Sequence, residues 1–116
     1  MRILSLANLA RVPVNVFGSS AVRSAAVANG AGESHCYVLD VAPGGIIGPH
    51  EAGFGQLLTP LEGDGWVAGP DGTRQPLPHG AVAIIERGEL HSKGSVSGMM
   101  ALMIQLYELD TSVIAT

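Results

Sequence analysis

Glycine and proline occur so often along this chain that long helices are disfavoured. There are 16 glycines and seven prolines among 116 residues, and each glycine inside a helix costs about 1 kcal/mol relative to alanine. Short apolar runs alternate with turn signals roughly every ten residues, a spacing typical of all-β folds. The pattern predicts roughly nine or ten short strands in one all-β domain over residues 1–116, arranged as a jelly-roll barrel.

Individual segments give more detailed predictions. We expect strands over residues 21–28 and 35–41. The dipeptide Asp71-Gly72 predicts a tight hairpin, because both residue types tolerate a positive φ. Residues 98–109 fit either a helix or a strand, and we favour a strand that completes the sheet. The apolar N-terminal segment, residues 1–20, is expected to pack on a sheet edge or on a dimer partner.

The charge pattern limits the partners of the protein. The chain has six basic and ten acidic residues, which gives a net charge of −4. The basic residues are scattered singly, so the footprint of a nucleic-acid-binding protein is missing. No apolar stretch approaches the roughly 18 residues that a membrane span needs. The single cysteine, Cys36, cannot form an internal disulfide. We expect a cytoplasmic homodimer with a small-molecule ligand and neither nucleic acid nor membrane as a partner.

Two glycine-framed histidine segments carry the strongest functional signal. The first segment contains, in order, Gly44, His50, Ala52, Gln56 and Gly63. The second contains Gly80, Gly88, His91 and Ser95. Their order and spacing resemble the two motifs of the cupin superfamily, and the resemblance covers about residues 37–106. It implies a cupin double-stranded β-helix, which is a jelly-roll barrel in a single domain.

A narrower resemblance covers the same part of the chain. A group of small bacterial cupins, uncharacterised in function, carries the pattern GxH, QL, GxGWVxGxDG and GExH. This sequence matches that pattern from Gly48 to His91. The group has no established reaction, so the closer match does not supply a substrate.

The departures from the family pattern concern the metal site. A metal-binding cupin usually supplies three histidines and one carboxylate, but the second histidine position is Ala52 and the carboxylate position is Gln56. The resemblance leaves His50, Gln56 and His91 as candidate ligands of a divalent metal such as Fe, Mn, Ni or Zn. If the segment is extended, Glu89 shares a face with His91. Glu89 is therefore the candidate catalytic residue, as a ligand or a general base.

Other interpretations of these residues remain open at this point. His50 and His91 could be polar residues that line a cavity without metal. Ala52 and Trp66 are candidate cavity or ligand contacts, although Trp66 also fits a core or dimer-interface position. The favoured function is a small-molecule-binding cupin with a degenerate divalent-metal site and no assigned reaction. The alternative is a metal-dependent (Fe/Mn) dioxygenase or isomerase acting on a small organic substrate, so the sequence leaves open whether the protein is an enzyme.

Overall fold

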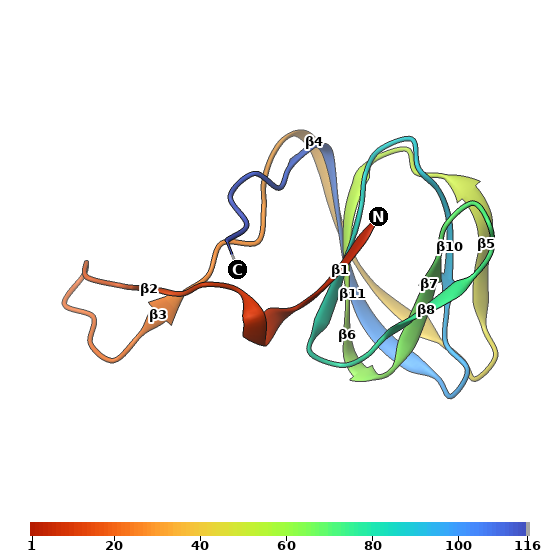
Figure 1. Cartoon of the computed structure of the whole chain (residues 1–116), viewed down its shortest axis with the longest axis horizontal. Helices are drawn as coiled ribbons and strands as arrows, with labels where there is room; N and C mark the ends of the chain where they lie inside the picture. Colours follow the sequence, from red (N-terminus) through yellow and green to blue (C-terminus); the bar gives the residue numbers. More distant parts are fainter. Residues whose placement is uncertain (116) are drawn as a thin grey trace.

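The computed structural model of the protein describes residues 1–115, in which two sheets face each other and close into a barrel (Figure 1). The strands are β1 (Arg2–Ser5), β2 (Val12–Pro13), β3 (Arg23–Ser24), β4 (Asn29–Val41), β5 (Ile46–Glu51), β6 (Gly55–Gly63), β7 (Gly65–Ala68), β8 (Arg74–Leu77), β9 (Ala81–Ile85), β10 (Leu90–Gly94) and β11 (Met99–Asp110). The larger sheet has the order β1-β9-β6-β11-β4 and the smaller sheet the order β5-β10-β7-β8. All paired neighbours in both sheets are antiparallel. The predicted all-β, jelly-roll class is confirmed.

The larger sheet carries apolar side chains on both faces. Successive side chains of a strand point to opposite faces, so Leu58 and Met103 enter the barrel core while Leu57 and Ile104 point outward. The inward set packs against Val67 and other side chains of the smaller sheet. The outward set is covered by apolar side chains from near the two ends of the chain: Leu4, Leu6, Val27, Ala28 and Ile114. The terminal segments therefore serve as a third layer over the barrel.

Two glycines show why the turns need this residue type. The N–H of Gly72 donates to the carbonyl of Gly69 at 3.0 Å, with φ +75° at Gly72, which closes the predicted hairpin between β7 and β8. Gly63 has φ +72°, and a Cβ there would collide with the carbonyl of Gly98. Glycine is the residue that adopts a positive φ without steric cost.

The local predictions were only partly correct. Residues 98–109 do form a strand, β11, because they pair with β4 on one side and β6 on the other. The strand expected over residues 35–41 begins earlier, at Asn29. The strand expected over residues 21–28 is wrong in extent: only Arg23–Ser24 is a strand, because its partner β2 is two residues long. Within the described residues, no helix is long and apolar enough to cross a membrane.

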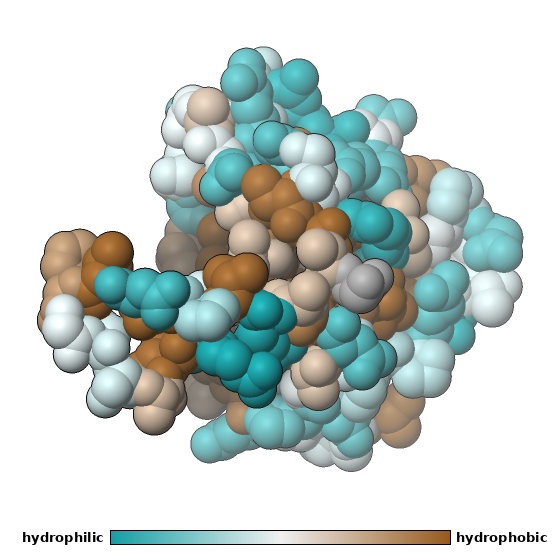
Figure 2. All heavy atoms as spheres, turned by 60° about the vertical axis from the view of Figure 1, so that its left-hand side comes forward, coloured by the Kyte–Doolittle hydropathy of each residue, from teal (hydrophilic) through white to brown (hydrophobic). Residues whose placement is uncertain are grey.

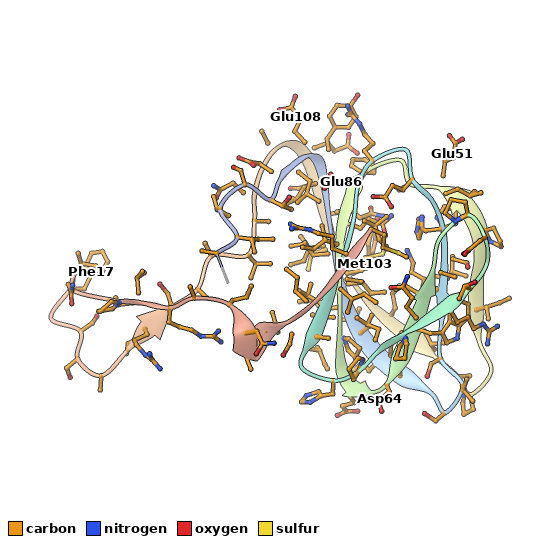
Figure 3. The ribbon with its side chains drawn as sticks, viewed as in Figure 1. Phe17, Glu51, Asp64, Glu86, Met103 and Glu108 are labelled. Carbon is orange, nitrogen blue, oxygen red and sulfur yellow. The ribbon has the colours of Figure 1, made fainter. Side chains whose placement is uncertain are left out.

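The N-terminal segment divides into two parts. β1 pairs with β9 at the edge of the larger sheet, and a 3-10 turn (Leu6–Asn8) follows it. The next residues, 12–24, form an arm that leaves the barrel, as Figure 1 shows at its left side. Phe17 lies at the tip of this arm and is 98% exposed (Figure 3). The arm explains a radius of gyration of 14.9 Å, against about 13 Å for a compact chain of this length.

Candidate functional site

His50 and His91 form a pair at one end of the barrel. They are directly opposite each other on the antiparallel strands β5 and β10, with ring centroids 4.5 Å apart. A register shift follows, in which the two residues Gly48 and Pro49 lie opposite the single residue Ser92. Such a bulge suits proline, which has no N–H for the ladder. His50 is exposed, whereas His91 is 1% exposed. The pair therefore runs from solvent into the barrel.

Lys93 completes this site, although it was not among the residues predicted from the sequence. It follows His91 by two positions on β10 and shares its face, and it pairs with the core residue Val67. It is 3% exposed. Its Nζ donates to Gln56 Oε1 at 2.8 Å and to His91 Nε2 at 3.1 Å. The ammonium thus joins two of the three predicted site residues.

The hydrogen bonds define the roles of the ring nitrogens. Because Nζ of Lys93 donates to His91 Nε2, the ring proton of a neutral His91 is on Nδ1, which faces the carbonyl of Glu89 at 3.3 Å. His50 Nδ1 lies 2.8 Å from the carbonyl of Gly48, so it donates there and leaves Nε2 free. Burial is the main cause of the lowered pKa of His91, and the charge of Lys93 lowers it further. A neutral His91 is therefore favoured.

The charge of Lys93 is poorly compensated. Burial lowers the pKa of its ammonium from 10.5 to about 8. Both acceptors that Nζ contacts, the Gln56 amide and the His91 ring, are neutral when His91 is unprotonated. A buried ion without a counter-ion carries a large desolvation cost. The site therefore has an excess of positive charge.

Glu89 does not reach this ammonium. Its carboxylate pairs with the N-terminal amino group of Met1 at 2.7 Å and also accepts the backbone N–H of Glu86 at 3.0 Å. The condition under which Glu89 would share the face of His91, an extended segment, is not met at residue 89, which precedes β10 and whose N–H bonds to the carbonyl of Glu86. The negative charge that Gln56 lacks is thus not restored by this residue.

The remaining predicted residues lie apart from the charged group. Ala52 is buried where β5 ends, and its backbone bonds to Gly88 and Glu89. Trp66 is next to the inward-facing Val67 on β7, so its ring is on the outer face of the smaller sheet. There the guanidinium of Arg74 lies 3.9 Å from its ring centroid. The structure brings together His50, Gln56 and His91, and does not bring Trp66 to them.

These residues do not fit the divalent metal that the family pattern implies. Gln56 Oε1 and His91 Nε2 are two of the atoms that would ligate the ion, and both are bound to the Lys93 ammonium. Ala52 supplies no donor atom, and a cation next to Lys93 would be repelled. Among the described residues, no three His, Cys, Asp or Glu side chains converge in a group that could hold a metal ion.

A polar row extends from Gln56 across the larger sheet. The strand register places Gln105 beside Gln56 and His35 beside Gln105, with their side chains on the same face. His35 in turn contacts Tyr37 and Phe54, at centroid distances of 6.0 and 5.4 Å. Sequence reasoning assigned no function to this row, since its members become neighbours only through strand pairing.

Comparisons with known proteins agree with this barrel. No protein-family model matches the sequence, and no curated protein shows significant similarity to it. Among solved structures, a conserved protein of unknown function from Streptococcus pyogenes is 18% identical with a TM-score of 0.59, over 66% of each chain. This chain thus spans about two thirds of that protein's length.

Two further solved structures extend the comparison. A cupin-like protein from Thermotoga maritima is 19% identical with a TM-score of 0.60, over 72% of this chain and 67% of its own. The polyketide cyclase RemF from Streptomyces resistomycificus is 19% identical with a TM-score of 0.58, over 99% of this chain and 87% of its own. Identities at this level establish the fold alone. Several of the structural neighbours are described as cupin proteins, and this chain has the cupin fold.

Proposed function

We propose that the protein is a small-molecule-binding cupin whose ligand enters the barrel at His50. The observation that carries this proposal is the pairing of an exposed His50 with a buried His91, followed by the buried Gln56 and Lys93. Ligand sites are concave and contain a few convergent polar groups. Four such groups from three strands meet here, at the end of the barrel where Figure 3 shows Glu51, the residue after His50.

The metal-dependent alternative has weaker support. A dioxygenase or isomerase using Fe or Mn needs open coordination positions on an ion held by several strong ligands. Here the Lys93 ammonium is bound to two of the candidate ligand side chains. We therefore propose binding without a resident divalent metal, and we assign no reaction.

Ligand binding can be tested with a small-molecule library and backbone NMR. We expect hits whose shift changes centre on residues 50, 56, 91 and 93, and whose affinity falls at least tenfold in His50→Ala and His91→Ala. His79→Ala is the matched control, because His79 is exposed and its backbone N–H bonds to Asp64, which Figure 3 shows at the opposite end of the barrel. Hits that map elsewhere, or that survive both site variants, would overturn the proposal.

We also propose that the protein works as a homodimer through its arm. Val12, Val16, Phe17 and Val22 expose apolar side chains on the arm. Near its base lies an apolar hollow of about 240 Å³, lined by Leu6, Val27, Leu57, Thr59, Val82 and Ile104. Figure 2 shows hydrophobic surface on the arm and on the barrel behind it. Exposed apolar surfaces of this kind mark interaction sites.

Light scattering after size exclusion tests the homodimer. The wild type should elute at twice the monomer mass, and Phe17→Asn should shift it toward the monomer. Asparagine suits the positive φ of 60° at residue 17. Val96→Ser is the control, because Val96 is equally apolar, 73% exposed and located in the turn between β10 and β11. A monomeric wild type would refute this part of the proposal.

The predicted cytoplasmic location remains a proposal as well. Cys36 points outward from β4 beside Ile104 and is an exposed free thiol. An exposed thiol persists best in a reducing compartment. Fractionation of cells that express the tagged protein would test the location directly.

A further inference from the structure

We propose that Lys93 is a built-in cation that binds the carboxylate of a small organic acid, at the position where a metal-binding cupin holds its metal ion. This inference rests on the proposed small-molecule site and specifies the chemical class of its ligand. It also assigns the binding charge to a residue outside the family pattern. Lys93 is the only lysine of the chain.

The first argument is the missing counter-ion. Lys93 is 3% exposed, and its Nζ contacts one amide oxygen and one imidazole nitrogen. The neighbouring carboxylate, Glu89, is paired with the Met1 amino group instead. Charged side chains are rarely buried without an ionic partner. An anion supplied from solution would offset the desolvation of this ammonium.

The second argument is the hydrogen-bonding capacity that remains. An ammonium has three N–H donors, and the described residues provide two acceptors for Nζ. The third donor is available to a carboxylate oxygen, which forms a strong charge-assisted bond with an ammonium. Neither Gln56 nor His91 needs to release Lys93 for this bond to form.

The third argument is the row of polar side chains that leads from solvent to the ammonium. His50 is exposed, its Nδ1 bonds to the carbonyl of Gly48, and its ring lies 4.5 Å from that of the buried His91, tilted by 53°. Polar side chains continue from Gln56 through Gln105 to His35, a span of two strand spacings or about 10 Å. The body of a small acid would lie along this row while its carboxylate contacts Lys93.

Matched pairs of acid and amide test the inference, since the two members have the same shape and differ in charge. Acetate with acetamide and benzoate with benzamide would be titrated at pH 7 by NMR. We expect at least one acid to bind ten times more tightly than its amide. Lys93→Met should abolish this preference, and Lys93→Arg should retain part of it. Arg74→Met removes a cation from the outer face of the smaller sheet and should leave the preference unchanged.

A second variant keeps the test decisive if Lys93→Met does not fold. Gln56→Glu introduces a carboxylate next to Nζ, where the amide oxygen lies at 2.8 Å. This internal counter-ion should reduce the affinity for acids at least tenfold and raise thermal stability. Unchanged acid binding in Gln56→Glu would overturn the inference.

The outcomes separate the inference from the function on which it rests. If amides bind as tightly as acids and lose affinity in His50→Ala, the inference fails and the small-molecule site stands. If acids bind with equal affinity in wild type and Lys93→Met, the carboxylate does not depend on Lys93. If neither acids nor the neutral library bind at this end of the barrel, both proposals fail.

Discussion

Nζ of Lys93 on β10 lies 2.8 Å from Oε1 of Gln56 on β6, so one hydrogen bond joins the two sheets inside the barrel. A neutral amide at position 56 accepts this bond without a formal negative charge. A carboxylate in its place would neutralise the ammonium within the protein. The identity of residue 56 therefore decides whether the buried positive charge remains available to a ligand.

The first prediction concerns stability and pH. The pKa of Lys93 is about 8 in the folded protein and 10.5 when exposed. Between these values the unfolded chain binds a proton that the folded chain has released. The unfolding free energy of wild type should therefore rise with pH relative to Lys93→Met, by up to about 3 kcal/mol between pH 8 and 10.5.

Urea denaturation of both proteins from pH 7 to 10.5 checks this prediction. The difference in unfolding free energy between the two proteins removes the contributions that both proteins share. Burial lowers the pKa of His91, the imidazole in contact with Nζ, so His91 stays neutral over this range. Below pH 8 the cost of burying the charge is fully present, so the difference should be flat there. A difference that is flat over the whole range would contradict the lowered pKa.

The second prediction concerns metal. Replacing Lys93 by alanine and Gln56 by glutamate leaves His50, His91 and a carboxylate, the two-histidine, one-carboxylate set that holds Fe(II). The double variant should gain several degrees of thermal stability with Co(II) or Ni(II), because a ligand at 100 times its Kd contributes about 2.7 kcal/mol.

Two controls accompany the metal experiment. Wild type should show no stabilisation, and neither should Gln56→Glu alone, because its new carboxylate would pair with Lys93. Calorimetric thermal shifts and metal content after gel filtration measure both. A wild type that retains one equivalent of metal after purification without chelator would contradict the assignment of Lys93 as the resident cation.

The third prediction concerns Trp66. Its ring lies on the outer face of the smaller sheet beneath the Arg74 guanidinium. Trp66→Phe should therefore leave ligand affinity within about twofold of wild type, while truncation to alanine should destabilise the fold by about 3 kcal/mol. Titrations on Trp66→Phe and urea denaturation of Trp66→Ala provide the two readings. A tenfold loss of affinity in Trp66→Phe would restore the initial expectation that this residue contacts the ligand.

The fourth prediction separates the free-energy cost of a positive φ from the cost of a steric collision when a glycine is replaced by alanine. Gly72 and Gly63 both have a positive φ, but a Cβ at residue 72 meets nothing within 4 Å whereas one at residue 63 collides with the Gly98 carbonyl. Gly72→Ala should be destabilised by about 1–2 kcal/mol from the backbone conformation alone. Gly63→Ala should lose clearly more unfolding free energy than Gly72→Ala. Equal losses in urea denaturation would show that the Gly98 segment moves aside without resistance.

The fold was predictable because its signals are local. The Asp71-Gly72 turn and the glycine-framed histidine segments lie in short stretches whose spacing follows from turn and strand geometry. The extent of strands was less predictable. Of the strand expected over residues 21–28, only Arg23–Ser24 forms, because its partner β2 is two residues long.

The site was predictable only in part. His50 and His91, both singled out by the sequence motifs, lie directly opposite each other because β5 pairs with β10. Lys93 was missed although it is two residues from His91 and is the only lysine in the chain. The alternation rule places it on the same face, but its burial follows from the neighbouring strand β7 and from β6 across the barrel. Likewise, the ion pair between Glu89 and the Met1 amino group joins residues 88 positions apart, so no local pattern indicates it.

The position of the sole lysine inside the barrel has a practical consequence. Reagents that acylate primary amines find two targets in this chain, the N-terminal amino group and Lys93. The N-terminal amine is paired with Glu89, whereas Nζ of Lys93 is buried against His91, whose ring lies beside the exposed His50. The rate of acylation at Lys93, followed by mass spectrometry of the unaltered protein, would therefore report how much of the site is filled.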